Sequence, residues 1–166
     1  MLFSSCGPEE LYPLDGFVPS DQFPTEDSYP GLKVRVMGLS DARWYCPTDD
    51  QVCISISHDT TKVPLDEKFA DVLYLKFDDT AFQDMAGQWS NEVNGKSISS
   101  KQAQQVAEFV TKYKDKQWLI IHCFAGISRS RSMAAAIANV LELPYRFTVV
   151  NKHVYNRVAR TLARVE

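Results

Sequence analysis

The stretch from Ile120 to Ser130 holds the residues whose types and spacing could do chemistry. It leaves an apolar run, makes a loop that opens at Cys123 and closes at Arg129, and enters a predicted helix. A loop at a helix N-terminus can turn backbone N–H groups toward a phosphate, and an arginine can bind two of its oxygens. The same positive field favours the thiolate of Cys123. The pattern therefore predicts nucleophilic displacement on a bound phosphoryl group.

The residues inside this loop are expected to hold the phosphate through their backbone. They are Phe124, Ala125, Gly126, Ile127 and Ser128, with Arg129 completing the site. Gly126 allows backbone angles that a residue with a side chain would resist. The competing interpretation is a buried structural cysteine beside an arginine that caps a helix.

The run 122–130 reads HCFAGISRS, which resembles the signature of the cysteine-dependent protein-tyrosine phosphatases. The form HCxxGxSRS is most similar to their compact dual-specificity branch. The resemblance implies that Cys123 attacks phosphorus and becomes a cysteinyl-phosphate, and that Ser130 donates to the sulfur as this intermediate breaks. It also implies that His122 orients the loop from beneath. The implied activity is hydrolysis of phosphotyrosine in proteins, with phosphoserine and phosphothreonine as further substrates to test, and with no metal or cofactor.

The resemblance further implies an upstream aspartate that protonates the leaving oxygen and then activates water. In the family, this residue lies just past the strand that precedes the helix before the signature. That strand here ends at Phe77, so the matching residue is Asp79, with Asp78 as the runner-up and Asp84 third. All three could instead be acids of a surface turn, which are common after strands. The following segment, 80–97, is long for such a connection and could be a lid or a surface excursion.

Other functions remain open alternatives. A phosphoinositide or an RNA 5′ end could be the substrate, but the loop carries no lysine to meet extra phosphates. A phosphate-binding module without turnover would be expected to lack the cysteine or the arginine, and both are present. Sulfur-transfer or arsenate-reducing chemistry would need a second thiol, for which only Cys46 or Cys53 could serve. Either of these cysteines could also form a reversible disulfide with Cys123.

The elements around the loop predict an α/β fold. Alternating or apolar runs indicate strands at 32–36, 52–56, 72–77 and 118–121. A capping box at 99–102 starts a predicted helix that runs to 113, a second spans about 128–141, and a third follows Pro144, with Phe147 and Val150 on its apolar side. We expect a mostly parallel sheet of four to five strands flanked by helices. Ligands bind at the carboxyl ends of such strands, which is where the loop begins.

Length and composition predict one domain with an additional N-terminal arm. The chain has 166 residues, of which 45% are hydrophobic and 23% charged, so it can bury one sizeable core. Residues 1–30 hold five of the eight prolines and several acids but no lysine or arginine. We interpret this acidic, proline-rich arm as either a flexible tail or a segment that packs over the domain at 31–166 through Phe17, Phe23 and other apolar residues.

Charge and cysteine spacing exclude several classes of function. The net charge of −3 lacks the cationic footprint of a nucleic-acid binder. No apolar run is long enough for a membrane helix, and the first residues do not resemble a secretory signal. The four cysteines form no C-x-x-C pair, which disfavours a structural zinc site. We therefore expect a cytoplasmic monomer with free thiols that acts on a phosphorylated protein.

The last predicted helix also has a basic face. It carries Arg146, Lys152, Arg157, Arg160 and Arg164. Such a face is usually solvated surface, and docking of acidic substrates is the alternative. Arg131 and Ser132, directly after the signature, occupy helix positions that could face solvent.

Overall fold

A parallel sheet lies at the centre of this computed structural model, which describes residues 16–48, 50–57, 65, 69–78, 97–124 and 127–166. Its strands are β1 (Lys33–Met37), β2 (Gln51–Ser57), β3 (Asp71–Lys76) and β4 (Trp118–His122). They lie in the order β1-β4-β2-β3, and every neighbouring pair is parallel. The expected α/β fold with a parallel sheet is confirmed, with four strands in the described residues.

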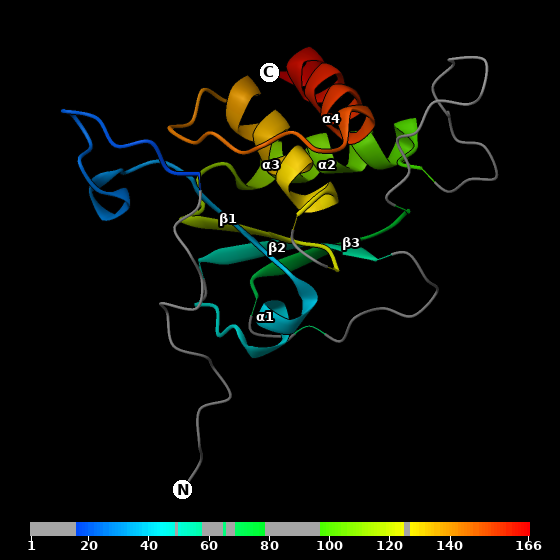
Figure 1. Cartoon of the computed structure of the whole chain (residues 1–166), viewed down its shortest axis with the longest axis horizontal. Coiled ribbons are helices and arrows are strands. Elements are labelled where there is room, and N and C mark those ends of the chain that lie inside the picture. Colours follow the sequence, from blue (N-terminus) through cyan, green and yellow to red (C-terminus); the bar gives the residue numbers. More distant parts are fainter. Residues whose placement is uncertain (1–15, 49, 58–64, 66–68, 79–96, 125–126) are drawn as a thin grey trace, which may run out of the picture.

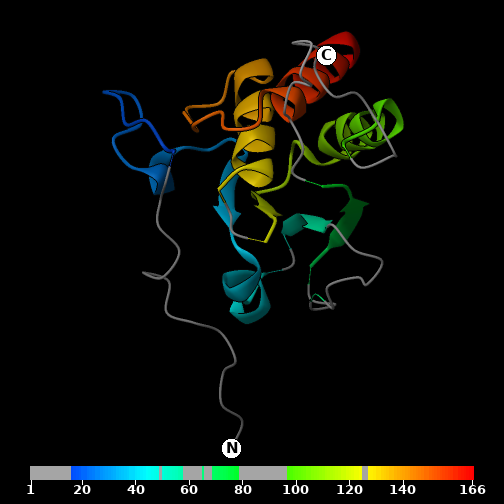
Figure 2. The same cartoon turned by 45° about the vertical axis from the view of Figure 1, so that its right-hand side comes forward.

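Helices cover both faces of this sheet unequally (Figures 1 and 2). On one face lie α2 (Ser100–Tyr113), α3 (Arg129–Val140) and α4 (Lys152–Val165). On the other face lies α1 (Leu39–Trp44), which follows β1 directly. The sequence did not predict α1, because six residues are too few to show a helical period. None of the helices in the described part of the chain is long and apolar enough to cross a membrane.

The alternation of side chains along the strands builds two cores. In β4, Leu119 and Ile121 pack in the larger core with α2, α3 and α4, whereas Ile120 packs in the smaller core with Ala42 of α1. In β2, Cys53 likewise belongs to the smaller core. Because both faces of these central strands are buried, most of their residues are apolar, as is typical of a parallel sheet.

The start of α2 is fixed at the carboxyl end of β3. The expected capping box is confirmed: the hydroxyl of Ser99 accepts from the backbone N–H of Gln102, and the Gln102 side chain accepts from the N–H of Ser99. The Gln102 side-chain amide also donates to the carbonyl of Lys76, at 2.7 Å. This contact joins the helix to the edge of the sheet where ligands bind in parallel α/β folds.

The last helix begins later than the sequence predicts. It starts at Lys152, capped by the side chain of Asn151, and the segment from Pro144 to the cap is not helical. The hydroxyl of Ser132 in α3 accepts from the backbone N–H groups of Val150 and Asn151, at 3.1 and 2.8 Å. These long-range contacts give the segment its hydrogen bonds without a helix. Val150, expected on an apolar helix face, is 51% exposed.

Residues 16–30 of the N-terminal arm pack against the domain. Phe17 forms an antiparallel bridge with Tyr145, and their rings meet edge to face at 5.6 Å between centroids. The carbonyl of Gly16 accepts from the backbone of Arg146. Gly16 has a φ of +101°, and a Cβ there would meet the ring of Phe147 at 2.5 Å, so this close approach needs glycine.

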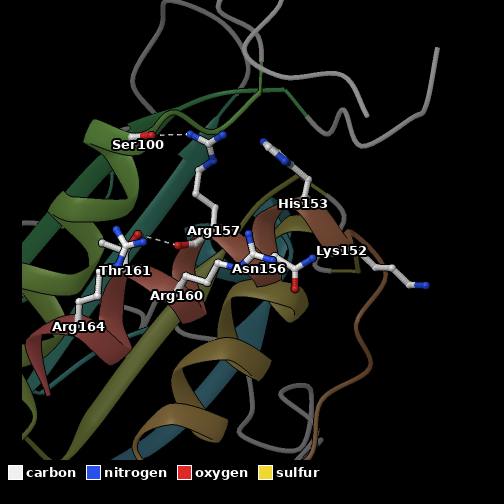
Figure 3. Close-up of a pocket in the computed structure, with 8 residues that line it drawn as sticks. All are labelled: Ser100, Lys152, His153, Asn156, Arg157, Arg160, Thr161 and Arg164. Carbon is white, nitrogen blue, oxygen red and sulfur yellow. Dashed lines mark hydrogen bonds between the residues drawn. The ribbon is translucent and has the colours of Figure 1, made fainter. Parts of the chain in front are cut away.

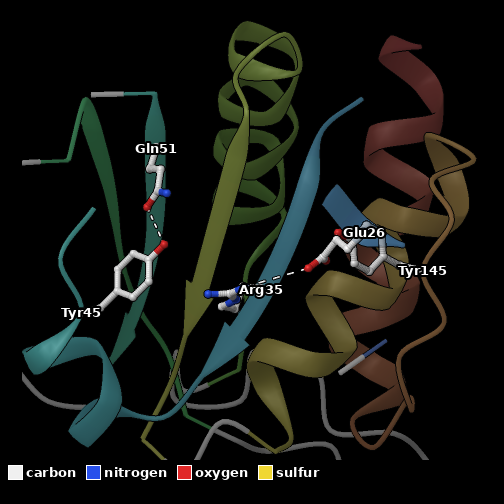
Figure 4. A network of polar contacts seen from close by, with 5 residues as sticks. All are labelled: Glu26, Arg35, Tyr45, Gln51 and Tyr145. Carbon is white, nitrogen blue, oxygen red and sulfur yellow. Dashed lines mark hydrogen bonds and ion pairs between the residues drawn. The ribbon is translucent and has the colours of Figure 1, made fainter. Parts of the chain in front are cut away.

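A buried polar group completes the contact of the arm (Figure 4). Glu26, in the short 3-10 helix η2 (Glu26–Ser28), accepts a hydrogen bond from the hydroxyl of Tyr145 and faces Arg35 of β1 at 4.0 Å. Arg35 also lies over the ring of Trp118, 4.5 Å from its centroid. All of the polar groups in this contact are nearly or fully buried. The arm is therefore held by specific pairing as well as by apolar packing.

Candidate active site

The sulfur of Cys123 lies at the carboxyl end of the central strand β4. Cys123 directly follows His122, the last residue of β4, and is 2% exposed. Its Sγ is 3.1 Å from the hydroxyl of Ser130, in the first turn of α3. The chain thus passes from strand to loop to helix as the sequence predicts, and returns to place a hydroxyl beside the thiol. The first turn of a helix adds unpaired N–H groups and a positive partial charge.

Arg129 is the first residue of α3, and it is buried beside this loop. It is 6% exposed, and its Nη1 donates to the backbone carbonyl of Phe77 at 2.8 Å. Phe77 follows β3 and extends the sheet pairing, because its N–H donates to the carbonyl of Ser57. The Nε of Arg129 is buried and has no hydrogen-bond partner among the described residues. A buried guanidinium N–H without an acceptor is unfavourable unless a ligand supplies one, and an oxyanion is its usual acceptor.

His122 is fully buried beneath the loop and keeps a fixed tautomer. Its Nδ1 contacts the carbonyl of Cys123 at 3.3 Å, and its Nε2 lies 2.7 Å from the hydroxyl of Ser55 in β2. Burial lowers the pKa of His122, and the positive charge of Arg129 lowers it further, against the backbone hydrogen bond to Cys123. A neutral ring that donates from Nδ1 to a carbonyl must accept at Nε2 from Ser55.

The loop between these residues is tied to α1 and carries exposed apolar side chains. The carbonyl of Phe124 accepts from the N–H of Leu39, the first residue of α1, at 2.9 Å. The side chains of Phe124 and Ile127 are 64% and 55% exposed. Ser128, which precedes α3, is half-buried. Ala125 and Gly126 lie outside the described residues.

The candidate general acids fall at the limit of the described chain. Asp78 is half-buried and directly follows Phe77, whose carbonyl holds Arg129. Asp79 and Asp84 lie outside the described residues, as does the expected lid or excursion up to residue 96. The segment that carries Asp78 therefore approaches the candidate site through Phe77.

The cysteines differ from the expectation of free thiols. Cys46 is disulfide-bonded, whereas Cys53 and Cys123 are free. Cys53 is fully buried in the smaller core, on the other face of the sheet from Cys123, and burial raises its pKa strongly. The arrangement therefore gives no support to a reversible disulfide between Cys123 and either of the two cysteines considered.

Two contributors to the site were missed by the sequence reasoning. Ser55 and the carbonyl of Phe77 reach it from distant parts of the chain. Ser132, which could have faced solvent, is fully buried. One signal was present: Ser55 is a polar residue inside an otherwise apolar strand, and such residues need a buried partner.

The types of group around Cys123 in the described residues suit an anion. Among them, no three His, Cys, Asp or Glu side chains gather where they could hold a metal. A thiol, a hydroxyl, a buried guanidinium and a helix N-terminus can together hold a tetrahedral oxyanion and attack it. No family model, curated protein or solved structure matches the chain.

Proposed function

We propose that this chain hydrolyses phosphomonoesters, with phosphotyrosine in proteins as the substrate, through a cysteinyl-phosphate on Cys123. The observation that carries the proposal is the arrangement of three side chains at the carboxyl end of β4. The sulfur of Cys123 lies 3.1 Å from the Ser130 hydroxyl, and both lie at the loop that Arg129 closes. Arg129 is held by Nη1, while its Nε has no partner within the part of the chain that the structure describes.

In the proposed first step, the Cys123 thiolate attacks phosphorus. The S–P bond forms as the P–O bond to the leaving group breaks, and Arg129 with the loop amides stabilises the charge on the other oxygens. Asp79, or Asp78 as the alternative, gives its proton to the leaving oxygen. In the second step this carboxylate takes a proton from water, which attacks phosphorus. The S–P bond breaks while Ser130 donates a hydrogen bond to the departing sulfur.

The exposed apolar side chains of the loop support phosphotyrosine over inositol phosphates or RNA ends. Phe124 and Ile127 expose more than half of their surface beside the buried sulfur. They can contact the ring of a phosphotyrosine, but offer nothing to additional phosphates. The proposed reaction needs Cys123 in its reduced form, and a cytoplasmic location is part of the proposal; the disulfide of Cys46 is the observation that speaks against that location.

The test is hydrolysis of p-nitrophenyl phosphate by the wild type, Cys123→Ser and Arg129→Ala. Loss of the nucleophile is expected to lower kcat by about 10⁴-fold or more. Loss of the guanidinium is expected to cost about 10²- to 10³-fold. Equal turnover by the wild type and Cys123→Ser would refute the proposal. Vanadate binding by a wild type that turns over no substrate would indicate a phosphate-binding module instead.

The same assay decides between the two leading general acids. If Asp79 is the acid, Asp79→Ala should lower kcat and flatten the alkaline side of the pH profile. Asp78→Ala serves as the matched control, because it removes a neighbouring carboxylate of the same segment. An unaltered profile in Asp79→Ala, with the effect appearing in Asp78→Ala, assigns the role to Asp78.

A further inference from the structure

A basic pocket of about 570 Å³ runs along the outer side of α4 (Figure 3). One stripe of α4 lines it, together with Ser100 at the start of α2. The stripe includes Lys152, Asn156, Arg157, Arg160, Thr161 and Arg164, at the three- and four-residue spacing of one helix face. No aspartate or glutamate of the described chain belongs to the lining.

Three of the four cationic side chains in this pocket are exposed. Lys152, Arg160 and Arg164 are exposed, and no described carboxylate pairs with any of them. Arg157 is positioned by a hydrogen bond from its Nη1 to the hydroxyl of Ser100, at 2.6 Å. The nearby carboxylate of Glu166 instead binds Lys114 and Thr111 of the α2 segment.

This clustering contrasts with the charge of the whole chain. The protein has a net charge of −3, yet four cationic side chains lie within the length of one short helix face. Like charges at i and i+4 destabilise a helix slightly, and Arg160 and Arg164 form such a pair in α4. Arginine is the side chain best suited to bind carboxylates and phosphates. The pocket is therefore complementary to an acidic partner.

The N-terminal end of the pocket is joined to α3, the helix whose first turn carries Arg129 and Ser130. Ser132, in the first turns of α3, binds the backbone of Val150 and Asn151, and α4 begins at the next residue, Lys152. From Lys152 to Arg164 the helix rises about 18 Å. An extended peptide of about five residues covers the same distance.

We propose that this pocket binds acidic residues that flank the phosphotyrosine of a protein substrate. This inference rests on the proposed function, because it places the phosphate of the same substrate at Cys123. Aspartate and glutamate side chains of the substrate pair with Lys152, Arg160 and Arg164 along the helix. Sequence reasoning left the basic face as either solvated surface or a docking site, and the pocket favours docking.

The experiment compares two phosphotyrosine peptides, one flanked by four acidic residues and one by alanine and serine. The wild type should hydrolyse the acidic peptide with a kcat/KM about 5- to 20-fold higher at low salt, and the preference should shrink as salt is added. The double variant R160Q/R164Q should lose most of it. Arg146→Gln, an exposed arginine outside the pocket, is the matched control and should retain it.

Two further readouts separate the failure of this inference from failure of the proposed function. Hydrolysis of p-nitrophenyl phosphate, which has no acidic flank, should be unchanged in R160Q/R164Q. Binding of the two peptides to Cys123→Ser, followed by fluorescence anisotropy, tests the pocket without turnover.

Two results of the kinetic comparison overturn the inference. One is an equal kcat/KM of the wild type for both peptides, and the other is a preference for the acidic peptide that R160Q/R164Q retains. Binding of an oligonucleotide or of anionic vesicles that depends on these arginines, without discrimination between the peptides, also overturns it.

Discussion

The hydroxyl of Ser130 lies 3.1 Å from the sulfur of Cys123, the proposed nucleophile. In the proposed reaction it matters mainly when the sulfur leaves phosphorus as a thiolate. A hydrogen bond to a charged group contributes about 1.5–3 kcal/mol. Loss of this bond should therefore act on the second chemical step more than on the first.

Ser130→Ala is expected to slow breakdown of the intermediate by about 10- to 100-fold. Stopped-flow release of p-nitrophenol should then show a burst followed by a slow steady state. Thr148→Ala removes an exposed hydroxyl outside the site and should behave as the wild type. A Ser130→Ala variant with unchanged kcat and no burst contradicts the assigned role.

The neutral state of His122 should appear in the pH dependence of stability. Burial lowers its pKa from the ordinary value of 6.5, so the unfolded chain takes up a proton before the folded one as pH falls. The stabilising contribution of His122 is thus complete above pH 6.5 and is lost progressively below it. Urea unfolding across this range should show that the wild type has a higher free energy of unfolding than His122→Gln. This difference should shrink as pH falls. A stability difference that grows as pH falls contradicts a buried neutral imidazole.

At the scale of elements, local sequence patterns were sufficient for the strands and for α2 and α3. Apolar runs marked β4 and β2, because a buried parallel strand is apolar on both faces. The capping box marked the start of α2 within one residue. The patterns failed for α1, which is too short, and for the start of α4, which a hydroxyl from α3 determines. A contact between residues distant in the chain leaves no local periodicity.

Ser132 is the side chain that sets the entry to α4, and its removal should destabilise the fold. Ser132→Ala leaves the N–H groups of Val150 and Asn151 without their acceptor, at a cost of about 1–3 kcal/mol in the free energy of unfolding. Chemical denaturation measures this loss. Thr148→Ala, in the same segment but exposed, should change stability by no more than about 0.5 kcal/mol. Equal stabilities of the two variants would show that the Ser132 bonds do not hold this segment.

At the scale of the whole molecule, long-range contacts assemble the site and hold the arm. Sequence spacing predicted the cysteine, the arginine and the loop between them, because they are local. It did not predict that the carbonyl of Phe77 would fix Arg129, or that Ser55 would bind His122. These partners meet only because β2 pairs with β4 and β3 pairs with β2 in the order of the sheet. Residues 16–30 of the arm are held in the same way, through Glu26 and Tyr145.

Tyr145→Phe should loosen the N-terminal arm without affecting the candidate site. It removes the donor to the buried carboxylate of Glu26, which should cost about 1.5–3 kcal/mol of unfolding free energy. Burial already raises the pKa of Glu26, and loss of this bond raises it further. The folded variant therefore binds a proton more readily than the folded wild type. Its loss of unfolding free energy relative to the wild type should thus be smaller at about pH 5 than at about pH 8. Chemical unfolding of the wild type and the variant at both pH values measures this loss. A loss that is larger at about pH 5 contradicts the role of Tyr145 as the donor to Glu26.

The central claim is that the sulfur of Cys123 carries the phosphoryl group during turnover. The most direct test is to mix the wild type and Ser130→Ala with p-nitrophenyl phosphate, quench in acid within the first turnover, and locate the modification by mass spectrometry of the digested protein. One phosphoryl group should be found on Cys123, at higher occupancy in Ser130→Ala than in the wild type. Turnover with an unmodified Cys123 in both proteins, or a phosphoryl group on another residue, contradicts the claim.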